Sequence, residues 1–413
     1  MISFELMKRL SLQNESKIVF IVADGLGGLA MKAGGKTELE TARTPNLDRL
    51  AARSSCGLVD PITPGITPGS GPAHLALFGY DPLEFDLGRG ILSTFGIRCF
   101  QKTPMNERNV AARMNFATLE NGLITDRRAG RVPDREGRRL ASLLDKGVGS
   151  IDGVKVTVEH EKEYRGALIL EARGLSGKIL DTDPGLLNKP PITPAALKGL
   201  PRAEAEKARK TAAVVKKFVQ RAAKILAKEH PANFVLLRGF DKFRPLPQFQ
   251  EVYKLNPAAV ATYPMYRGVA RLLGMEVLKT GTTIKDELKT LRENFADHDY
   301  FFFHVKKTDS AGEDGDFDAK VRVIEEMDAV IPGVLKLKPD VLMITGDHST
   351  PALLKSHSWH PLPVLVYSKY ARRDSVRKFG EGDCAAGCLG RIRATDLMPI
   401  AMANALKLAK YGA

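Results

Sequence analysis

Carboxylate and imidazole side chains follow several apolar runs of this sequence, at the point where each run ends. The candidates are Asp24 after residues 17–23, Asp309 and Glu313 after residues 300–305, Asp347 and His348 after residues 341–345, and His357, nine residues beyond His348. Carboxylate oxygens and imidazole nitrogens together suit Mn, Zn or Mg, and two such ions form the clamp used in phosphoryl displacement. Taken singly, such a carboxylate is more often a helix cap and a lone histidine is usually structural, but the combination favours metal binding.

Ser70 is the candidate nucleophile, because it lies between Gly69 and Gly71 just before the apolar run 72–78. A serine hydroxyl reacts poorly by itself, and metal coordination activates and orients it. The flanking glycines allow a phosphate to approach the backbone closely, and the N-terminus of the predicted helix favours an anion. A Ser-Gly loop is a weak signal in isolation and gains weight from the predicted metal ligands.

Short arginine motifs supply candidate anion-binding groups. Arginine favours phosphate and carboxylate because its planar guanidinium binds two oxygens at once. The candidate motifs are Asp126-Arg127-Arg128-Ala129-Gly130-Arg131, Tyr164-Arg165-Gly166, Leu237-Arg238-Gly239 and Tyr266-Arg267-Gly268. A single arginine is as readily a solvated surface group, but the glycine that follows three of these arginines favours close approach of a ligand.

The apolar runs before the metal-type ligands are predicted strands, and ligands of open α/β sheets bind beyond the carboxyl ends of such strands. Helices are predicted from Thr44-Pro45 onward, over residues 72–78 and over residues 318–331. The middle of the chain has short alternating stretches, such as residues 154–158 and 167–171, which are typical of an α+β unit. We therefore predict a metal-binding domain built from residues 1–100 and 241–413, with a second domain, residues 101–240, inserted between them.

Composition narrows the class of protein. The chain has 413 residues, 44% hydrophobic and 27% charged, which is typical of a globular protein. No apolar stretch reaches the roughly 18 residues of a membrane span, the N-terminus lacks a signal-peptide pattern, and four cysteines favour a cytoplasmic protein without disulfides. The net charge of +14 raises nucleic-acid binding as an alternative, but the densest basic stretch, residues 202–228, is typical of an amphipathic helix with a solvated face.

A series of motifs occurs in a fixed order from about Lys17 to the C-terminus. They are DGLGG, TARTPNLDRLA, TPGSGPAHLALFGYDP, DRRAGR, YRGALIL, DTDP, LLRG, YPMYRGVARLLGMEV, HVKKTD, TGDHSTP and HSWHPLPV. With these motifs the chain resembles the archaeal-type cofactor-independent phosphoglycerate mutases, a branch of the alkaline phosphatase superfamily. The resemblance implies an α/β fold: an alkaline phosphatase-like core with a mainly parallel sheet flanked by helices, plus an inserted α+β cap domain that binds the substrate.

The resemblance also implies roles for individual residues. Asp24, Ser70, Asp347 and His348 match the ligands of one metal ion, with Ser70 as nucleophile, and Asp309 and His357 match ligands of a second ion. Asp126, Arg127 and Arg165 match substrate-binding motifs of the cap, Arg238 matches one near the domain hinge, and we add Arg267 to this set. The family pattern D-x-x-G-H is DSAGE at Asp309 to Glu313. We therefore expect Glu313 to replace a histidine ligand and to favour hard cations such as Mn and Mg over Zn.

The predicted function is that of an isomerase that interconverts 3-phosphoglycerate and 2-phosphoglycerate without bisphosphoglycerate. The resemblance implies a phosphoserine on Ser70 and two divalent metal ions, with Mn favoured and Mg, Co or Zn as alternatives. A metal-dependent phosphatase or a small-molecule phosphotransferase, like the relatives proposed to phosphorylate homoserine, is the alternative function. The expected partner is the small-molecule substrate, with no nucleic acid and no membrane, and homo-oligomer formation is left open.

Overall fold

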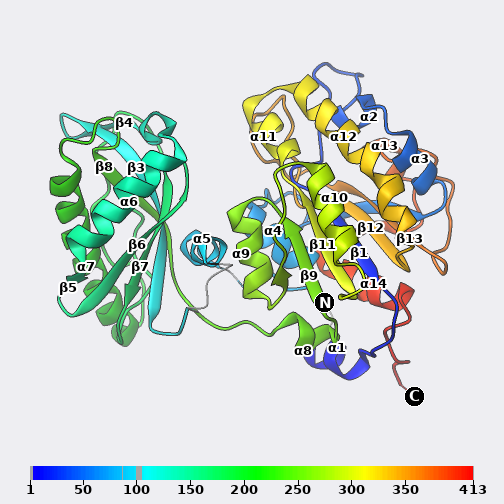
Figure 1. The fold of residues 1–413 in the computed structure, drawn as a ribbon, viewed down its shortest axis with the longest axis horizontal. Coiled ribbons are helices and arrows are strands. Elements are labelled where there is room, and N and C mark those ends of the chain that lie inside the picture. Colours follow the sequence, from blue (N-terminus) through cyan, green and yellow to red (C-terminus); the bar gives the residue numbers. More distant parts are fainter. Residues whose placement is uncertain (1–2, 86, 99–104, 413) are drawn as a thin grey trace. The chain divides into compact units, whose positions relative to one another are not determined.

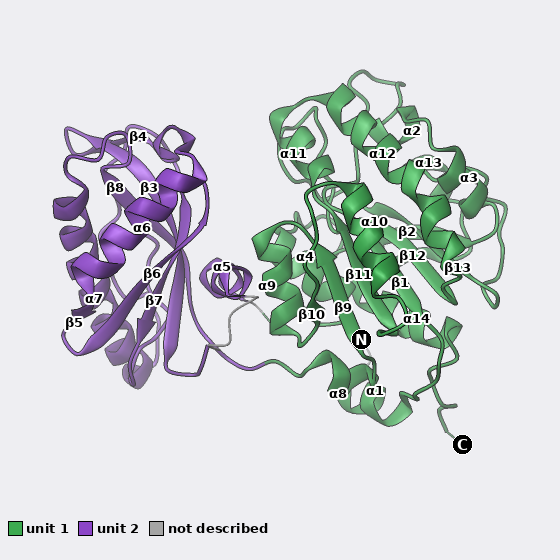
Figure 2. Cartoon of the chain, in the orientation of Figure 1, with its two compact units in different colours: residues 1–86, 246–413 green, residues 87–245 purple. Residues whose placement is uncertain are grey.

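The computed structural model describes residues 3–85, 87–98 and 105–412. The chain divides into two compact units: unit 1 comprises residues 1–86 and 246–413, and unit 2 comprises residues 87–245 (Figure 2). This division differs from the predicted boundaries at 100/101 and 240/241, because helix α5 (Arg89–Ile97) packs on strands β3 (Asn109–Glu120) and β8 (Phe234–Lys242) of unit 2. The predicted chain crossing near Gln101 lies outside the described residues.

Unit 1 is built around a mainly parallel sheet (Figure 1). Its described strands are β1 (Ile18–Ala23), β2 (Ser55–Asp60), β9 (Pro257–Ala261), β10 (Glu276–Val277), β11 (Tyr300–Val305), β12 (Val341–Gly346), β13 (Leu362–Ser368) and β14 (Gly390–Arg393). They lie in the order β10-β9-β11-β1-β12-β13-β2-β14, and only β13 runs antiparallel to its neighbours. The predicted fold class, an α/β core with a mainly parallel sheet, is confirmed.

Helices flank this sheet, and Figure 1 shows α10 and α12 in front of it. The described helices of unit 1 are α1 (Phe4–Leu10), α2 (Glu38–Thr41), α3 (Pro45–Ala51), α4 (Ser70–Leu77), α8 (Phe249–Tyr253), α9 (Pro264–Leu272), α10 (Ile284–Glu293), α11 (Lys307–Asp314), α12 (Phe317–Lys336), α13 (Glu381–Cys384), α14 (Leu397–Asn404) and the 3-10 turn η2 (Ala394–Asp396). Within the described ranges, none of the helices combines the length and the apolar character that a membrane crossing requires.

The register of the three central strands brings the ends of distant segments to one level. Ala23 at the end of β1 pairs with Val305 of β11 on one side and with Gly346 of β12 on the other. All three strands are buried along their full length, as expected for parallel strands covered on both faces. The residues that follow them, Asp24 and Asp347 among them, therefore emerge side by side at the carboxyl edge of the sheet.

Unit 2 is an α+β unit with an antiparallel sheet (Figure 1). Besides α5, β3 and β8 it contains β4 (Leu123–Asp126), η1 (Ala129–Arg131), α6 (Asp134–Val148), β5 (Ser150–Ile151), β6 (Val154–Lys162), β7 (Arg165–Glu171) and α7 (Arg202–Leu226). Side chains alternate along β3: Ala112 and Met114 join the core shared with α6 and α7, whereas Ala111 packs with Ile91 of α5. The sheet is thus covered on both faces, and α5 belongs to this unit because it closes the second face.

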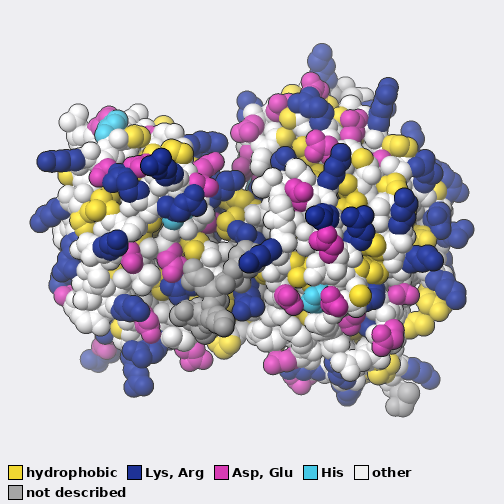
Figure 3. Space-filling model, in the orientation of Figure 1, with side chains coloured by type: hydrophobic (Ala, Val, Ile, Leu, Met, Phe, Trp, Pro, Cys, Tyr) yellow, Lys and Arg dark blue, Asp and Glu magenta, His cyan; other side chains and the backbone are white. Residues whose placement is uncertain are grey.

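On the face of the molecule that Figure 3 shows, positive charge is not gathered in one patch. Figure 3 shows Lys and Arg side chains spread across the visible face, with Asp and Glu side chains among them. The predicted basic helix is present as α7, which buries Ala208, Val215 and Phe218 and leaves lysines and arginines exposed. This is the arrangement of an amphipathic helix with a solvated charged face.

Candidate active site

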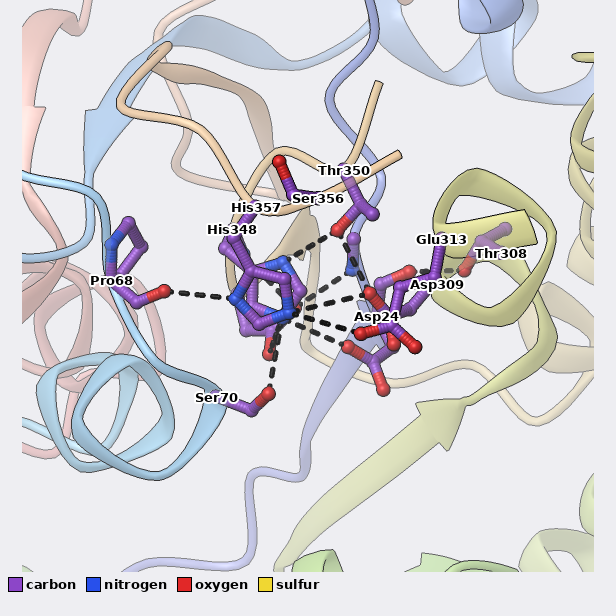
Figure 4. Close-up of polar contacts among 12 residues, drawn as sticks. Asp24, Pro68, Ser70, Thr308, Asp309, Glu313, His348, Thr350, Ser356 and His357 are labelled. Carbon is purple, nitrogen blue, oxygen red and sulfur yellow. Dashed lines mark hydrogen bonds and ion pairs between the residues drawn. The ribbon is translucent and has the colours of Figure 1, made fainter. Parts of the chain in front are cut away.

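Ser70 and Asp24 converge on one imidazole nitrogen of His348 (Figure 4), and Asp347 approaches the same nitrogen. The Nε2 atom of His348 lies 3.2 Å from the Ser70 hydroxyl, 3.2 Å from Asp24 Oδ1 and 3.2 Å from Asp347 Oδ2. The side chains of Asp24, Asp347 and His348, which we call the buried cluster, are fully buried. These three oxygens and one nitrogen come from three segments of the chain. Together they are a set of ligand atoms that can bind a divalent cation.

Two oxygens of the buried cluster are left without a hydrogen bond among the described residues. They are Asp24 Oδ1 and Asp347 Oδ2, the same atoms that face His348 Nε2. Burial raises the pKa of Asp347 well above its usual value, and the neighbouring charge of Asp24 adds to this. Burial acts in the same direction on Asp24, but the positive charge of Lys306 opposes it, and the pKa of Asp24 lies well below its usual value. Since unpaired buried carboxylate oxygens are costly, these residues fit a divalent metal ion that would satisfy both.

The hydroxyl of Thr350 fixes which nitrogen of His348 carries the proton. It lies 2.8 Å from Asp309 Oδ1 and 2.9 Å from His348 Nδ1. A carboxylate accepts hydrogen bonds, so Thr350 donates to Asp309 and accepts from His348 Nδ1. His348 Nε2 then presents its lone pair to the cluster, which is the tautomer that binds a metal. Burial lowers the pKa of His348, and the imidazole is therefore neutral.

A second group of ligand atoms adjoins the first and shares His348. Asp309, His348 and His357, which we call the outer cluster, each offer one ligand atom within 4.8 Å of the others. His357 Nδ1 donates to the carbonyl of Pro68 at 2.9 Å, so its Nε2 presents a lone pair, 3.6 Å from Asp309 Oδ1. Glu313 stands 4.0 Å from His357 Nε2, is 57% exposed and lies outside this group. Its role as a ligand stays a prediction.

Two hydrogen-bond donors occupy the other oxygen of Asp24, and neither follows from the ligand pattern of the sequence. Lys306 Nζ lies 2.9 Å from Asp24 Oδ2 and also contacts Asp309, while the Tyr266 hydroxyl donates to the same Oδ2. Burial alone would lower the pKa of Lys306, but the two carboxylates raise it above its usual value, so the side chain is an ammonium ion. Lys306 lies in the motif HVKKTD and Tyr266 in the motif YPMYRG, both quoted above. The sequence alone does not show that these two residues contact Asp24.

Ser70 is held at the first position of α4, with Gly69 as the N-cap residue. His74, one turn later, donates from Nδ1 to the Ser70 carbonyl at 2.8 Å and lies 3.3 Å from Asp347 Oδ2. Burial lowers the pKa of His74 to about 4, so this imidazole is also neutral. The helix thus fixes the backbone of Ser70 while its half-buried hydroxyl faces His348.

In unit 2, two of the predicted arginines meet one carboxylate that the ligand pattern did not single out. Arg127 donates from Nε and Nη2 to the two oxygens of Asp183, both at 2.8 Å, and Arg238 Nη1 lies 3.5 Å from the same carboxylate. Asp183 is 7% exposed. Burial alone would raise the pKa of Asp183, but the hydrogen bonds from Arg127 and the Gly185 backbone lower it below its usual value.

The remaining substrate-binding candidates lie apart from this pair of arginines. Arg165 is the first residue of β7 and is half-buried. Asp126, at the end of β4, accepts hydrogen bonds from the backbone N–H groups of Arg128 at 2.7 Å and Gly130 at 2.6 Å, so it stabilises the following turn. Arg267 lies in α9 of unit 1. Their roles toward a substrate stay predictions.

The fold and the site together define unit 1 as an α/β protein with a serine and two adjoining groups of metal-type ligands at the carboxyl edge of a parallel sheet. The family model described as 2,3-bisphosphoglycerate-independent phosphoglycerate mutase matches residues 51–233. A Thermotoga maritima protein is 47% identical over 409 residues, and a Thermus thermophilus protein is 48% identical over 414 residues; each match covers 99% of both chains. Both relatives bear the name "probable 2,3-bisphosphoglycerate-independent phosphoglycerate mutase". The chain belongs to this family, as the order of its motifs predicted.

Solved structures agree with this assignment at the level of the fold. A protein from Pyrococcus horikoshii matches with a TM-score of 0.81 and 30% identity, over 96% of this chain and 99% of that one. The cofactor-independent phosphoglycerate mutase from Thermoplasma acidophilum matches with a TM-score of 0.68 and 28% identity, over 94% of this chain and 100% of that one. The matches span both units of the chain, so the inserted unit is part of the shared architecture.

Proposed function

We propose that the protein is an isomerase that interconverts 3-phosphoglycerate and 2-phosphoglycerate without bisphosphoglycerate, by transferring the phosphoryl group to Ser70 and back. The observation that carries this proposal is the convergence of Ser70, Asp24 and Asp347 at 3.2 Å from His348 Nε2. A serine hydroxyl among cation-binding oxygens is the arrangement of an activated nucleophile. The two bacterial relatives that bear the mutase name support the same activity over the full length of the chain.

The residues of the buried cluster suit both halves of such a transfer. In the first half, a bond forms between Ser70 Oγ and phosphorus while the bond from phosphorus to the glycerate oxygen breaks; Ser70 gives up its hydroxyl proton, and the released glycerate oxygen takes up one proton, so that the step balances. In the second half, the other hydroxyl of the glycerate attacks the phosphoserine and frees Ser70. Lys306, an ammonium ion in contact with Asp24 and Asp309, adds a fixed positive charge where negative charge develops. Bound divalent ions would supply the remaining charge stabilisation.

We propose that two divalent ions bind, one at the buried cluster and one at the outer cluster, and that Mn is the preferred metal. The buried cluster offers oxygen ligands from Asp24, Asp347 and Ser70 around a single nitrogen, and oxygen-rich sites suit hard cations. Glu313, beside His357, would add a further oxygen to the outer cluster. Imidazole suits Zn better than carboxylate does, so this replacement favours Mn over Zn.

We propose that unit 2 supplies the groups that bind the substrate, Asp126, Arg127, Arg165 and Arg238, and that Arg267 of unit 1 adds to them. Asp183 accepts a bidentate pair of hydrogen bonds from Arg127 and lies near Arg238, so it holds both guanidinium groups in place. Two guanidinium groups around one carboxylate leave an excess of positive charge. That excess suits the carboxylate or the phosphate of phosphoglycerate.

We also propose a cytoplasmic location. The cysteines within the described ranges, Cys56, Cys384 and Cys388, are free thiols. Free thiols in this number fit a reducing compartment.

The experiment that tests the proposed function measures mutase activity of the full chain in an enolase-coupled assay with Mn²⁺ and without bisphosphoglycerate. Ser70→Ala is expected to lower turnover by about 1,000-fold or more and to abolish the phosphoprotein formed from labelled substrate, because the nucleophile is lost. Ser356→Ala is the matched control, since this hydroxyl is exposed and, among the described residues, donates to the nearby carbonyl of Leu354. Substantial activity of Ser70→Ala would overturn the mechanism, and release of free phosphate, or ATP consumption, in place of isomer equilibration would overturn the activity.

A further inference from the structure

The two oxygens of Asp24 have different surroundings. Oδ2 receives the Tyr266 hydroxyl and lies 2.9 Å from Lys306 Nζ. Oδ1 has no hydrogen bond among the described residues and faces His348 Nε2 at 3.2 Å. The carboxylate is therefore oriented so that one oxygen is occupied by protein donors and the other is left for a cation.

We infer that Tyr266 is a positioning residue for the metal site: its hydroxyl, by donating to Asp24 Oδ2, makes Asp24 bind the cation through Oδ1 alone. The inference rests on the proposed function, because it takes the buried cluster to be a divalent metal site. Without the Tyr266 hydroxyl, Oδ2 is held only by the flexible side chain of Lys306, 2.9 Å away. The carboxylate can then rotate more widely about its terminal torsion, which is broad for aspartate, and offer either oxygen or both. The hydroxyl thus removes alternative binding geometries before the cation arrives.

Tyr266 suits this role because its ring is held by packing on several sides. It is 1% exposed, its ring stacks on that of His304 with centroids 3.8 Å apart, and the ring of His74 lies 4.6 Å away. A fixed ring with two side-chain torsions places the hydroxyl at one point. A phenol hydroxyl donates one hydrogen bond and a carboxylate only accepts, so Tyr266 is the donor in this contact.

Lys306 approaches the same oxygen of Asp24, but it contacts both clusters, whereas Tyr266 contacts the buried cluster. Its flexible side chain is 18% exposed, and its ammonium group contacts Asp309 of the outer cluster as well as Asp24. A change at Lys306 would therefore disturb both clusters at once, by charge as well as by geometry. Among the described residues, the Tyr266 hydroxyl makes its hydrogen bond to Asp24 of the buried cluster, so its loss is expected to affect one site selectively.

Tyr266→Phe is the informative variant, because it keeps the ring and its stacking on His304 and removes only the hydroxyl. Tyr300→Phe is the matched control. Tyr300 is fully buried in β11, and its hydroxyl has no hydrogen-bond partner among the described residues. If removal of any buried tyrosine hydroxyl weakened metal binding through the fold, both variants would show it.

The experiment titrates the purified full chain with Mn²⁺ alone, in phosphate-free buffer, by calorimetry and by electron paramagnetic resonance of free Mn²⁺. Tyr266→Phe is expected to weaken one of the two Mn²⁺ sites by about 10- to 100-fold, the usual effect of losing the partner of a metal ligand. Tyr300→Phe is expected to stay within about twofold of the wild type. A folded Tyr266→Phe protein with unchanged affinity at both sites would overturn the inference and leave the proposed function standing.

A second measurement compares the wild-type protein with Tyr300→Phe, and so does not depend on the stability of Tyr266→Phe. Adding Zn²⁺, which is transparent in the near ultraviolet, is expected to produce a tyrosine difference band that Tyr300→Phe retains, because the cation withdraws charge from Asp24. Metal binding without such a band would overturn the Tyr266 contact. A wild-type protein that binds neither Mn²⁺ nor Zn²⁺ would instead overturn the metal requirement of the proposed function.

Discussion

The buried cluster and the outer cluster share His348 but differ in their exposure to water. Every side chain of the buried cluster is 0% exposed, whereas exposure in and beside the outer cluster rises from 5% for Asp309 to 22% for His357 and 57% for Glu313. Charges are screened little in a buried site and strongly near water. For the two cation sites that we propose, we therefore expect tighter binding at the buried cluster than at the outer cluster, with His348 shared between them.

The difference follows from where the ligands come from. Asp24 and Asp347 continue adjacent strands whose register is fixed by the sheet, so their positions are set by the core of unit 1. Asp309 and Glu313 lie on the short helix α11, and His357 lies in the loop between β12 and β13. Ligands on a strand end are held more rigidly than ligands on a short helix and a loop.

The largest expected effect is a loss of Mn²⁺ affinity, compared between a substitution in the buried cluster and one beside the outer cluster. Asp24→Asn is expected to weaken Mn²⁺ binding at the buried cluster by more than about 100-fold, since loss of an outer partner alone costs 10- to 100-fold. Glu313→Gln, which removes an exposed charge, is expected to weaken binding by less than about 10-fold. Two-site calorimetric titration measures both. Equal losses in the two variants would show that burial does not distinguish the clusters.

The next effect is on the free energy of unfolding, and it concerns the loops that carry the ligands of the buried cluster. Lys320 of α12 is fully buried and donates to the carbonyls of Gly27 at 2.8 Å and Thr350 at 2.9 Å, which ties together the loops that follow β1 and β12. Burial lowers the pKa of Lys320 from 10.5 to about 8, although Glu38 opposes the shift. Between these values the unfolded chain binds more protons than the folded one, so the contribution of Lys320 to the free energy of unfolding rises with pH.

The measurement is the difference in the free energy of unfolding between the wild type and Lys320→Met, obtained in denaturant at pH 7.5 and at pH 9.5. This difference is expected to shift in favour of the wild type by about 2 kcal/mol as the pH rises. The buried tyrosines and Cys56 contribute equally to the pH dependence of both proteins, so their contributions cancel in this difference. A difference that does not change with pH would mean that Lys320 keeps its proton, and that the loops are tied by a permanent charge.

The sequence predicted the frame of the buried cluster well. The apolar run 300–305 coincides with β11, and the runs 17–23 and 341–345 correspond to β1 and β12, because buried parallel strands are continuous apolar runs that end at polar residues. It did not predict that β13 runs antiparallel, nor that α5 belongs to unit 2. Strand direction and helix placement depend on packing partners that local composition does not contain.

The partners of the ligands could not be predicted in the same way. Tyr266, Lys306 and Thr350 each contact a ligand, but two of them meet Asp24 from α9 and from the end of β11, which are distant in sequence. Asp183 likewise becomes prominent only because Arg127 and Arg238 meet it in space. Residue type and spacing identify a ligand, whereas a supporting donor is defined by a contact.

A smaller effect would sharpen the contrast in metal preference. Glu313→His restores the imidazole of the family pattern beside His357, whose Nε2 lies 4.0 Å from the present carboxylate. Zn²⁺ affinity of the outer cluster is expected to rise relative to Mn²⁺ by about 10-fold, because imidazole suits Zn better than a carboxylate does. Competition titration between the two metals measures the ratio. An unchanged ratio with unchanged affinities would show that Glu313 is not a ligand.

The smallest expected effect tests whether the two clusters are coupled. Thr350 links them, since its hydroxyl donates to Asp309 and accepts from His348 Nδ1, and it is fully buried. Thr350→Val keeps the shape of the side chain and removes both hydrogen bonds, which is expected to cost about 1 kcal/mol, or about 5-fold in Mn²⁺ affinity, at each cluster. Because His348 Nδ1 loses its acceptor, the imidazole can adopt the other tautomer, and the loss should appear at both sites in one titration. A loss confined to the outer cluster would mean that Thr350 orients Asp309 only, and that a cation at Nε2 selects the tautomer of His348 without the help of Thr350.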